Sequence, residues 1–288
     1  MTLTHFSLFS GIGGLDLAAE WAGFRTIGQV EYANYPFRVL RRRFGRMPRW
    51  RDIRDVTGEE IIERCGVPTV ISGGFPCQPH SLAGKRLGSR DERELWGELA
   101  RVVREVMPRW FVGENVAGLR SSESGRFFGR VLRDLAEMGY TVGWGSWEAA
   151  DAGAPHHRER VFIVAHSPNI RHSIGVDRGS HRERVALSSD LGQDTDIWGE
   201  PRRCRTDVAY PPSEHERVLV PVGGKVEFPP WSAGPRGDLW LSEPDVGRVA
   251  DGIPSRVDRL KCLGNAVVPQ QAFPIFQAIA AIEMGVVV

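Results

Sequence analysis

The most chemically reactive feature of the sequence is a single thiol held in a loop of glycine and proline. Cys77 lies within the stretch Gly-Gly-Phe-Pro-Cys-Gln-Pro at residues 73–79, directly after a short apolar run at 67–72 that predicts a buried strand. Pro76 has a fixed φ, whereas the glycines adopt backbone conformations that other residues avoid. A thiol at the carboxyl end of such a strand stands where open α/β sheets bind ligands. A lone cysteine is otherwise most often a small core residue, but this setting favours a nucleophile.

A glycine loop and two carboxylates form a second chemical pattern. Residues 9–14, Phe-Ser-Gly-Ile-Gly-Gly, join a predicted strand to a predicted helix, and such glycines let backbone amides approach a ligand at a helix N-terminus. The pattern differs from the dinucleotide fingerprint G-x-G-x-x-G. Glu31 ends the next predicted strand, where it could accept both hydroxyls of a ribose, and Asp52 ends the following segment, where it could accept from an adenine amino group. These residues predict a site for a nucleoside that brings no phosphate.

A third pattern pairs an acid with two arginines. Glu114 begins the sequence Glu-Asn-Val just after a predicted strand, and a carboxylate beside a thiol suggests an acid that works with a nucleophile. Arg158 and Arg160 lead into another strand, where a spacing of two puts both guanidinium groups on one face. The adjacent histidines at 156–157 would point to opposite sides of an extended chain, so we expect no metal site.

Alternating strands and helices must position these residues. The periodicity of apolar residues predicts strands at 4–9, 26–30, 67–72, 110–112 and 161–164, and helices at 15–22, 35–44, 58–64, 95–106 and 126–138. Such alternation predicts an α/β fold, a Rossmann-like and mostly parallel sheet with helices on both faces.

The alternation stops near residue 166. Residues 167–242 are rich in Arg, His, Asp, Ser, Gly and Pro, yet they carry more spaced aromatic residues than a solvated linker needs, so we expect a small irregular domain. Apolar patterning returns near Val257, the stretch 263–269 predicts a turn that delivers a polar side chain near the core, and 273–288 predicts a docked helix and strand. The expected parts are residues 1–166, 167–242 and 243–288.

Composition limits the class of protein. The chain has 288 residues and a net charge of +1, so nucleic-acid binding would depend on local patches of charge. Nearly all of its fixed cations are arginine, which suits bidentate recognition of phosphate and guanine but also reflects a GC-rich genome. The four cysteines lie far apart, which argues against a zinc cage or a disulfide framework. The N-terminal sequence does not resemble a signal peptide, and the apolar C-terminal stretch is too short to span a bilayer. We therefore expect a cytoplasmic protein that does not bind membranes.

Together these patterns closely resemble the DNA (cytosine-5) methyltransferases of bacteria and phages. The Cys77 loop, the Glu-Asn-Val triplet, the arginine pair and Leu-Gly-Asn-Ala-Val-Val-Pro at 263–269 occur in that family's order, and the likeness covers residues 4–166 and 255–275. The resemblance implies a class I S-adenosylmethionine-dependent methyltransferase that methylates C5 of a cytosine flipped out of a specific duplex DNA sequence. It also implies a covalent bond between Cys77 and C6 of the base.

The resemblance implies a role for each matched residue. Glu114 would hydrogen-bond or protonate N3 of the cytosine, Arg160 would hold its O2, and Arg158 would belong to the same catalytic group. Residues 80–95 would close over DNA and 167–242 would recognise the target. Expected at the cofactor site are Phe9, Ser10, Gly11, Ile12, Gly13, Gly14, Glu31, Asp52, Ile53, Pro76, Asn265 and Val267. Expected at the DNA are Gln78, Ser81, Lys85, Arg90 and Asn115. One departure from the family is His156, which stands where Gln is common.

Three other functions need comparison with this one. A zinc cytidine deaminase would need an H-x-E motif upstream of a P-C-x-x-C motif, and the sequence has neither the upstream motif nor the second cysteine. An RNA cytosine-5 methyltransferase, with tRNA as acceptor, and a non-enzymatic DNA-binding protein on the same fold both stay open, although intact Cys77, Glu114 and Arg160 argue against the latter. The expected partners are duplex DNA and a cognate restriction endonuclease, which need not contact this protein directly. The protein itself is expected to be a monomer.

Overall fold

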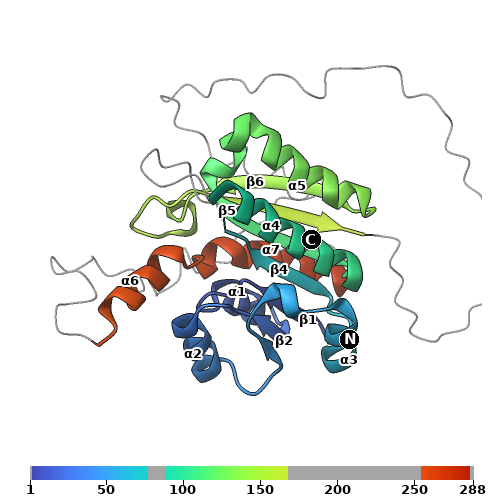
Figure 1. The fold of residues 1–288 in the computed structure, drawn as a ribbon, viewed down its shortest axis with the longest axis horizontal. Helices are drawn as coiled ribbons and strands as arrows, with labels where there is room; N and C mark the ends of the chain where they lie inside the picture. The colour runs from blue at the N-terminus through green and yellow to red at the C-terminus, as the bar shows by residue number, and fades with distance from the viewer. Residues whose placement is uncertain (1, 77–87, 168–253, 286–288) are drawn as a thin grey trace, which may run out of the picture.

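The structure is a computed structural model that describes residues 2–76, 88–167 and 254–285. Within these residues the chain forms one seven-stranded sheet with helices on both faces (Figure 1). The strands are β1 (Thr4–Leu8), β2 (Arg25–Val30), β3 (Arg49–Trp50), β4 (Val70–Gly74), β5 (Trp110–Val116), β6 (Thr141–Trp147) and β7 (Arg160–His166). The helices are α1 (Gly14–Trp21), α2 (Asn34–Arg43), α3 (Gly58–Cys65), α4 (Gly88–Val106), α5 (Arg126–Glu137), α6 (Arg256–Asn265) and α7 (Pro269–Glu283), with short 3₁₀ segments η1 (Ile53–Asp55), η2 (Ala117–Gly125) and η3 (Ala150–Ala152).

The strand order is β3-β2-β1-β4-β5-β7-β6. The first five strands in this order pair in parallel, and only β7 runs against its neighbours. Because parallel strands end at the same edge of a sheet, the loops after β1, β2, β4 and β5 lie close together. This topology confirms the predicted Rossmann-like, mostly parallel fold.

Both faces of the sheet are buried, as expected for central parallel strands. Successive residues of a strand point to opposite faces, and Phe111 accordingly packs with α3, α4 and α5 while Val112 packs with α1 and α7. Figure 1 shows α4 and α5 in front of the sheet and α7 behind it. The return of the C-terminal helix is further secured by Glu283, which accepts a hydrogen bond from the Trp110 indole (2.8 Å) and pairs with Arg109 (2.8 Å). Helix α7, at the other end of the sequence, therefore packs on the sheet that the N-terminal strands form.

Four predictions of secondary structure were wrong in detail. The edge strands β3 and β6 were not predicted, since β3 has only two residues and Gly143 and Gly145 interrupt the pattern of β6. Strand β5 continues through Glu114, which was expected in a loop. Helix α4 begins at Gly88 rather than Leu95, so the expected closing loop at 80–95 is helical from 88 onward; the segment is dense in charged residues that favour helices.

The fourth concerns residues 263–269, which were expected to form a turn that delivers a polar side chain near the core. They end α6 and begin α7, and Asn265 is exposed. The apolar residues of α6 are exposed as well, by 76% at Val257 and 51% at Leu263. The expected turn is therefore a junction between two helices.

The predicted target-recognition region, residues 167–242, lies outside the described residues apart from Ser167, so the expected division into parts stays a prediction. Among the helices of the described ranges, none is long and apolar enough to cross a bilayer.

Candidate active site

A cavity of about 910 Å³ opens where the strands end. It is lined by residues expected from the sequence for two different tasks, cofactor binding and catalysis. These residues are Phe9, Gly11, Ile12, Glu31, Asp52, Ile53, Pro76, Glu114, Arg160 and Asn265. Asn115, which was expected at the DNA, lines the cavity as well. Helix α6 adds residues that the sequence did not indicate, Asp258, Lys261 and Cys262. The fold therefore brings both groups of candidates into one space.

The glycines of the loop have two roles: two of them allow close packing, and one lines the cavity. Gly11 and Gly13 have φ values of +56° and +90°, in the left-handed region that glycine adopts easily. A Cβ on Gly13 would lie 2.3 Å from the Phe44 ring, and one on Gly14 would lie 2.5 Å from the Val267 carbonyl oxygen. Gly13 and Gly14 thus allow neighbouring segments to approach, whereas Gly11 faces the cavity.

Ser10 and Val267 also lie behind the cavity rather than on its wall. The Ser10 hydroxyl donates to the carbonyl oxygens of Ser7 (3.2 Å) and Val30 (3.3 Å), which ties the loop to β1 and β2. The Val267 backbone packs closely against Gly14. Their contacts are those of a scaffold beneath the predicted cofactor site.

Glu31 joins the glycine loop to the end of β2. Its Oε2 accepts from the backbone N–H of Gly11 (2.8 Å) and its Oε1 accepts from that of Ala33 (2.7 Å). Burial raises the pKa of this carboxyl above its ordinary value, while the two backbone hydrogen bonds and Arg51 oppose the rise. The amide that would meet a phosphate in a dinucleotide site is therefore already engaged by a carboxylate, as suits a ligand without phosphate.

Asp52 stands at the end of β3 and caps the short η1 segment. Its Oδ1 accepts from the backbone N–H of Arg54 (3.0 Å), and the Arg54 guanidinium binds both of its oxygens. The hydrogen bond from that guanidinium lowers the pKa of Asp52. Its neighbour Ile53, only 2% exposed, adds an apolar surface to the same wall.

Glu114 is the buried acid of the cavity. Its side chain lies within 3.0 Å of the Arg160 Nε, and in the sheet its backbone is opposite Gly74 and Phe162. Burial raises its pKa to about 7, although Arg160 and Arg158 act to lower it. A carboxyl group with this pKa exchanges a proton near neutral pH, which is the property of a general acid.

Gly74 makes room for this acid. A Cβ at Gly74 would lie 3.0 Å from the Glu114 Oε2, so a larger residue would press on the carboxylate. The sequence indicated this glycine only as a flexible part of the Cys77 loop. Its contact with Glu114 depends on the pairing of β4 with β5.

Asn115 binds the backbone that leads to Cys77. Its Nδ2 donates to the Phe75 carbonyl oxygen (2.9 Å), and its Oδ1 accepts from the Val116 N–H (2.9 Å). The side chain is buried, and its amide positions the segment before Pro76. Contact with substrate, which the sequence suggested, stays a prediction.

Arg158 and Arg160 have different partners. Arg160 pairs with Glu114, whereas the Arg158 Nη2 donates to the carbonyl oxygens of Gly264 (2.7 Å) and Ala266 (2.8 Å). Arg158 therefore ties the junction between α6 and α7 to the segment that leads into β7. Gln271, which the sequence did not indicate, supports the same junction by donating to the Arg158 carbonyl oxygen (2.9 Å).

With this geometry in place, comparison with known proteins identifies the family. The model of the family "C-5 cytosine-specific DNA methylase" matches residues 3–192. The chain belongs to the C-5 cytosine-specific DNA methylases. The match includes the glycine loop, Glu31, Glu114 and both arginines, and it confirms the resemblance seen in the sequence.

Individual relatives agree. The Type II methyltransferase M.NgoBI of Neisseria gonorrhoeae is 38% identical over 164 residues, 57% of this chain and 50% of the relative. M.HaeII of Haemophilus aegyptius is 31% identical over 78% of this chain and 71% of the relative. A solved E. coli structure, described as a DNA modification methyltransferase encoded within a prophage, shares 27% identity with a TM-score of 0.51, over 58% of this chain and 47% of that one. The chain spans about half the length of several curated relatives that it matches.

Several predicted site residues lie outside the described part of this C-5 cytosine-specific DNA methylase chain. These are Cys77, Gln78, Ser81 and Lys85, together with the side chain of Arg90, whose backbone belongs to α4. Their roles stay predictions. In the described ranges, no group of three or more His, Cys, Asp or Glu side chains is arranged to hold a metal ion.

Proposed function

We propose that the protein is a DNA (cytosine-5) methyltransferase that uses S-adenosylmethionine. The observation that carries this proposal is the buried Glu114, whose pKa of about 7 fits a proton donor to a cytosine ring. It shares one cavity with Glu31 and Asp52, and it lies beside the strand that leads to Cys77. Family membership supports the same activity.

The residues of the cavity suit S-adenosylmethionine by their chemistry. Glu31 and Asp52, at successive strand ends, can accept hydrogen bonds from ribose hydroxyls and from an adenine amino group. Phe9, Ile12 and Ile53 add apolar surface to the same cavity. When bound, S-adenosylmethionine supplies the electrophilic methyl group.

The remaining chemistry falls to the residues of this chain. The Cys77 thiolate attacks C6 of cytosine and forms an S–C6 bond, while Glu114 donates a proton to N3 so that the ring does not hold a full negative charge. C5 becomes nucleophilic and accepts the methyl group. The C5 proton then passes to solvent, the S–C6 bond breaks to return the thiolate, and N3 gives its proton back to Glu114, which restores the aromatic ring. In this proposal Arg160, whose Nε lies 3.0 Å from the Glu114 carboxylate, binds the O2 of the base.

The target base must leave the duplex, because C6 is hidden within the base stack. Recognition of a specific DNA sequence by residues 167–242, a cognate restriction endonuclease and a monomeric state are further predictions of this proposal.

A trapping experiment tests the function. Fluorine at C5 cannot leave as a cation, so duplex DNA with 5-fluorocytosine in the target site should form a denaturation-resistant complex only when S-adenosylmethionine is present. Cys77→Ala should abolish the complex but retain non-covalent DNA binding, since phosphate contacts supply much of the affinity. Cys65→Ala, at a half-buried thiol on α3, is the matched control and should trap as the wild type does. The target sequence for this DNA is first identified by bisulfite sequencing of genomic DNA from cells that express the protein.

Two results would contradict the proposal. One is methylation of DNA by Cys77→Ala at the wild-type rate. The other is methyl transfer to tRNA but not to duplex DNA, which would favour the RNA methyltransferase instead.

A further inference from the structure

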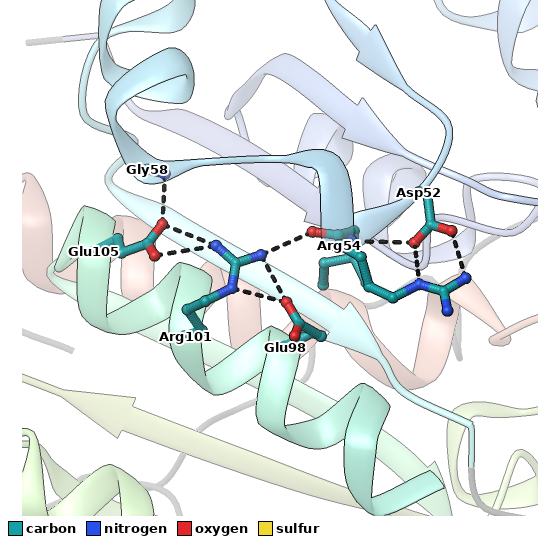
Figure 2. A network of polar contacts seen from close by, with 7 residues as sticks. Asp52, Arg54, Gly58, Glu98, Arg101 and Glu105 are labelled. Carbon is teal, nitrogen blue, oxygen red and sulfur yellow. Dashed lines mark hydrogen bonds and ion pairs between the residues drawn. The ribbon is translucent and has the colours of Figure 1, made fainter. Parts of the chain in front are cut away.

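Helix α4 is bound to the turn that carries Asp52 and Ile53 by a network of polar contacts (Figure 2). At its centre is Arg101, whose Nη2 donates to the Ile53 carbonyl oxygen (2.9 Å). This contact joins residues that are 48 positions apart in the sequence. Ile53 and Asp52 line the cavity, whereas Arg101 does not. Arg101 therefore reaches the cavity wall from behind.

Two glutamates of the same helix fix the orientation of Arg101. Its Nε donates to Glu98 (2.7 Å) and its Nη1 donates to both carboxylate oxygens of Glu105 (3.0 Å each). A guanidinium group bound on both sides in this way has little freedom to rotate. The Arg101 Nη2 is therefore held in the orientation in which it donates to the Ile53 carbonyl oxygen.

Glu105 also holds the start of α3. Its Oε2 accepts from the backbone N–H of Gly58 (2.7 Å), and a Cβ at Gly58 would lie 2.4 Å from the Glu105 Cβ. The chain from Asp52 to Gly58 is therefore bound to α4 at two points, Ile53 and Gly58. Figure 2 shows Arg101 and Glu105 on the side of the helix that faces Gly58.

The middle of α4 packs against the strand that leads to Cys77. The ring of Trp96 lies 5.0 Å from that of Phe75, and the Leu99 Cδ1 would lie 2.9 Å from a Cβ on Gly73. One rigid helix thus contacts both the Asp52–Ile53 turn and the segment that ends at Pro76.

We propose that Arg101 is a positioning residue for the adenosine part of the methyl donor. By holding the Ile53 carbonyl oxygen, it fixes the turn that presents Asp52 and Ile53 to the cavity, and α4 keeps that turn in register with the Cys77 segment. This inference rests on the proposed function, since it takes S-adenosylmethionine as the ligand of the cavity.

Ion pairs within a helix are by themselves a weak reason to assign a role. Pairs at i,i+3 and i,i+4 contribute little to stability when exposed, and the Arg101 side chain is 29% exposed. The hydrogen bond to Ile53 is different, because it joins separate elements and ends on the wall of the cavity. A positioning residue should change ligand affinity when it is replaced, whereas a residue that only stabilises the helix should change stability alone.

The test compares Arg101→Gln with Arg104→Gln, a control on the exposed face of the same helix. Binding of S-adenosylhomocysteine is measured by calorimetry, and KM for S-adenosylmethionine, KM for DNA, kcat and Tm are measured on the full chain. We expect Arg101→Gln to weaken S-adenosylhomocysteine binding and to raise KM for S-adenosylmethionine by about tenfold, the scale of one hydrogen bond from a charged donor. KM for DNA should stay within about twofold, while Arg104→Gln should match the wild type in every measurement. Arg101→Lys keeps the positive charge but loses the planar guanidinium group, so its ligand affinity should lie between that of Arg101→Gln and that of the wild type.

Unchanged affinity for S-adenosylhomocysteine in Arg101→Gln would overturn the inference, even if Tm fell, because the role would then be structural only. Should Arg101→Gln fail to fold, Glu105→Gln loses part of the same network and is expected to weaken binding in the same direction; wild-type affinity in that variant would overturn the inference equally. A wild-type protein that binds no S-adenosylhomocysteine would overturn the proposed function, and this inference with it.

Discussion

Glu114→Gln should remove a pH dependence of stability that the buried acid creates. The ordinary pKa of a glutamate, 4.5, applies in the unfolded chain, whereas burial raises the pKa of Glu114 to about 7 in the folded protein. A group whose pKa is raised on folding binds more protons in the folded state, so its contribution to stability is complete below the unfolded pKa. That contribution is lost as the pH rises through the folded pKa. Glutamine cannot ionise, so the variant should not show this loss.

The structure sets the size of the effect. The shift from 4.5 to about 7 is worth on the order of 3 kcal/mol, since one pKa unit corresponds to about 1.4 kcal/mol. Between about pH 5 and about pH 8, the wild type should therefore lose about 2–3 kcal/mol of unfolding free energy relative to Glu114→Gln. Other titrating groups, such as the buried Asp16, are present in both proteins and cancel in the difference.

Urea unfolding of both proteins at a series of pH values measures this difference directly. Glu137→Gln, at an exposed glutamate of α5, is the matched control and should follow the wild type. Parallel curves for the wild type and Glu114→Gln across this pH range would show that Glu114 is not held in a desolvated site. The same variant should trap 5-fluorocytosine DNA slowly, since an amide cannot donate its proton to N3 as an acid does.

Two further changes test the proposed cofactor site, one at the Gly14–Val267 contact beneath it and one at Glu31 on its wall. Gly14→Ala puts a Cβ 2.5 Å from the Val267 carbonyl oxygen, and we expect a loss of about 1–3 kcal/mol in unfolding free energy, with weaker S-adenosylmethionine binding; wild-type values in calorimetry and urea unfolding would refute the close contact. Glu31→Ala should weaken S-adenosylmethionine binding about tenfold to a hundredfold, as expected for a charge-assisted hydrogen bond, and unchanged affinity in calorimetry would remove Glu31 from the site.

Much of the site could be predicted from local sequence. A glycine loop after the first strand and carboxylates at the ends of the next two follow from short-range patterns of apolar and turn residues. In a parallel sheet such strand ends meet at one edge, so Glu31 and Asp52 were expected together before any contact was known. The structure places both on one cavity.

The properties of the predicted catalytic residues could not be inferred in this way. The pKa of Glu114 depends on burial by β4 and β7 and on Arg160, which lies 46 positions later in the numbering of the sequence. The contact of Gly74 with the same carboxylate arises only when β4 pairs with β5. Desolvation is a property of the packed interior, and no local pattern specifies which segments enclose a given side chain.

The sequence by itself determined most of the order of strands and helices along the chain, the residue types at the strand ends of the site and, through the resemblance of its motifs, the family. Only the tertiary structure decided what those residues contact: that Arg158 holds the carbonyl oxygens of Gly264 and Ala266 rather than the buried acid, and that Arg101 supports Ile53 from behind the cavity. The physical reason is that strand and helix propensity act between near neighbours along the chain, whereas burial and hydrogen bonding join residues that are close only after the chain has folded.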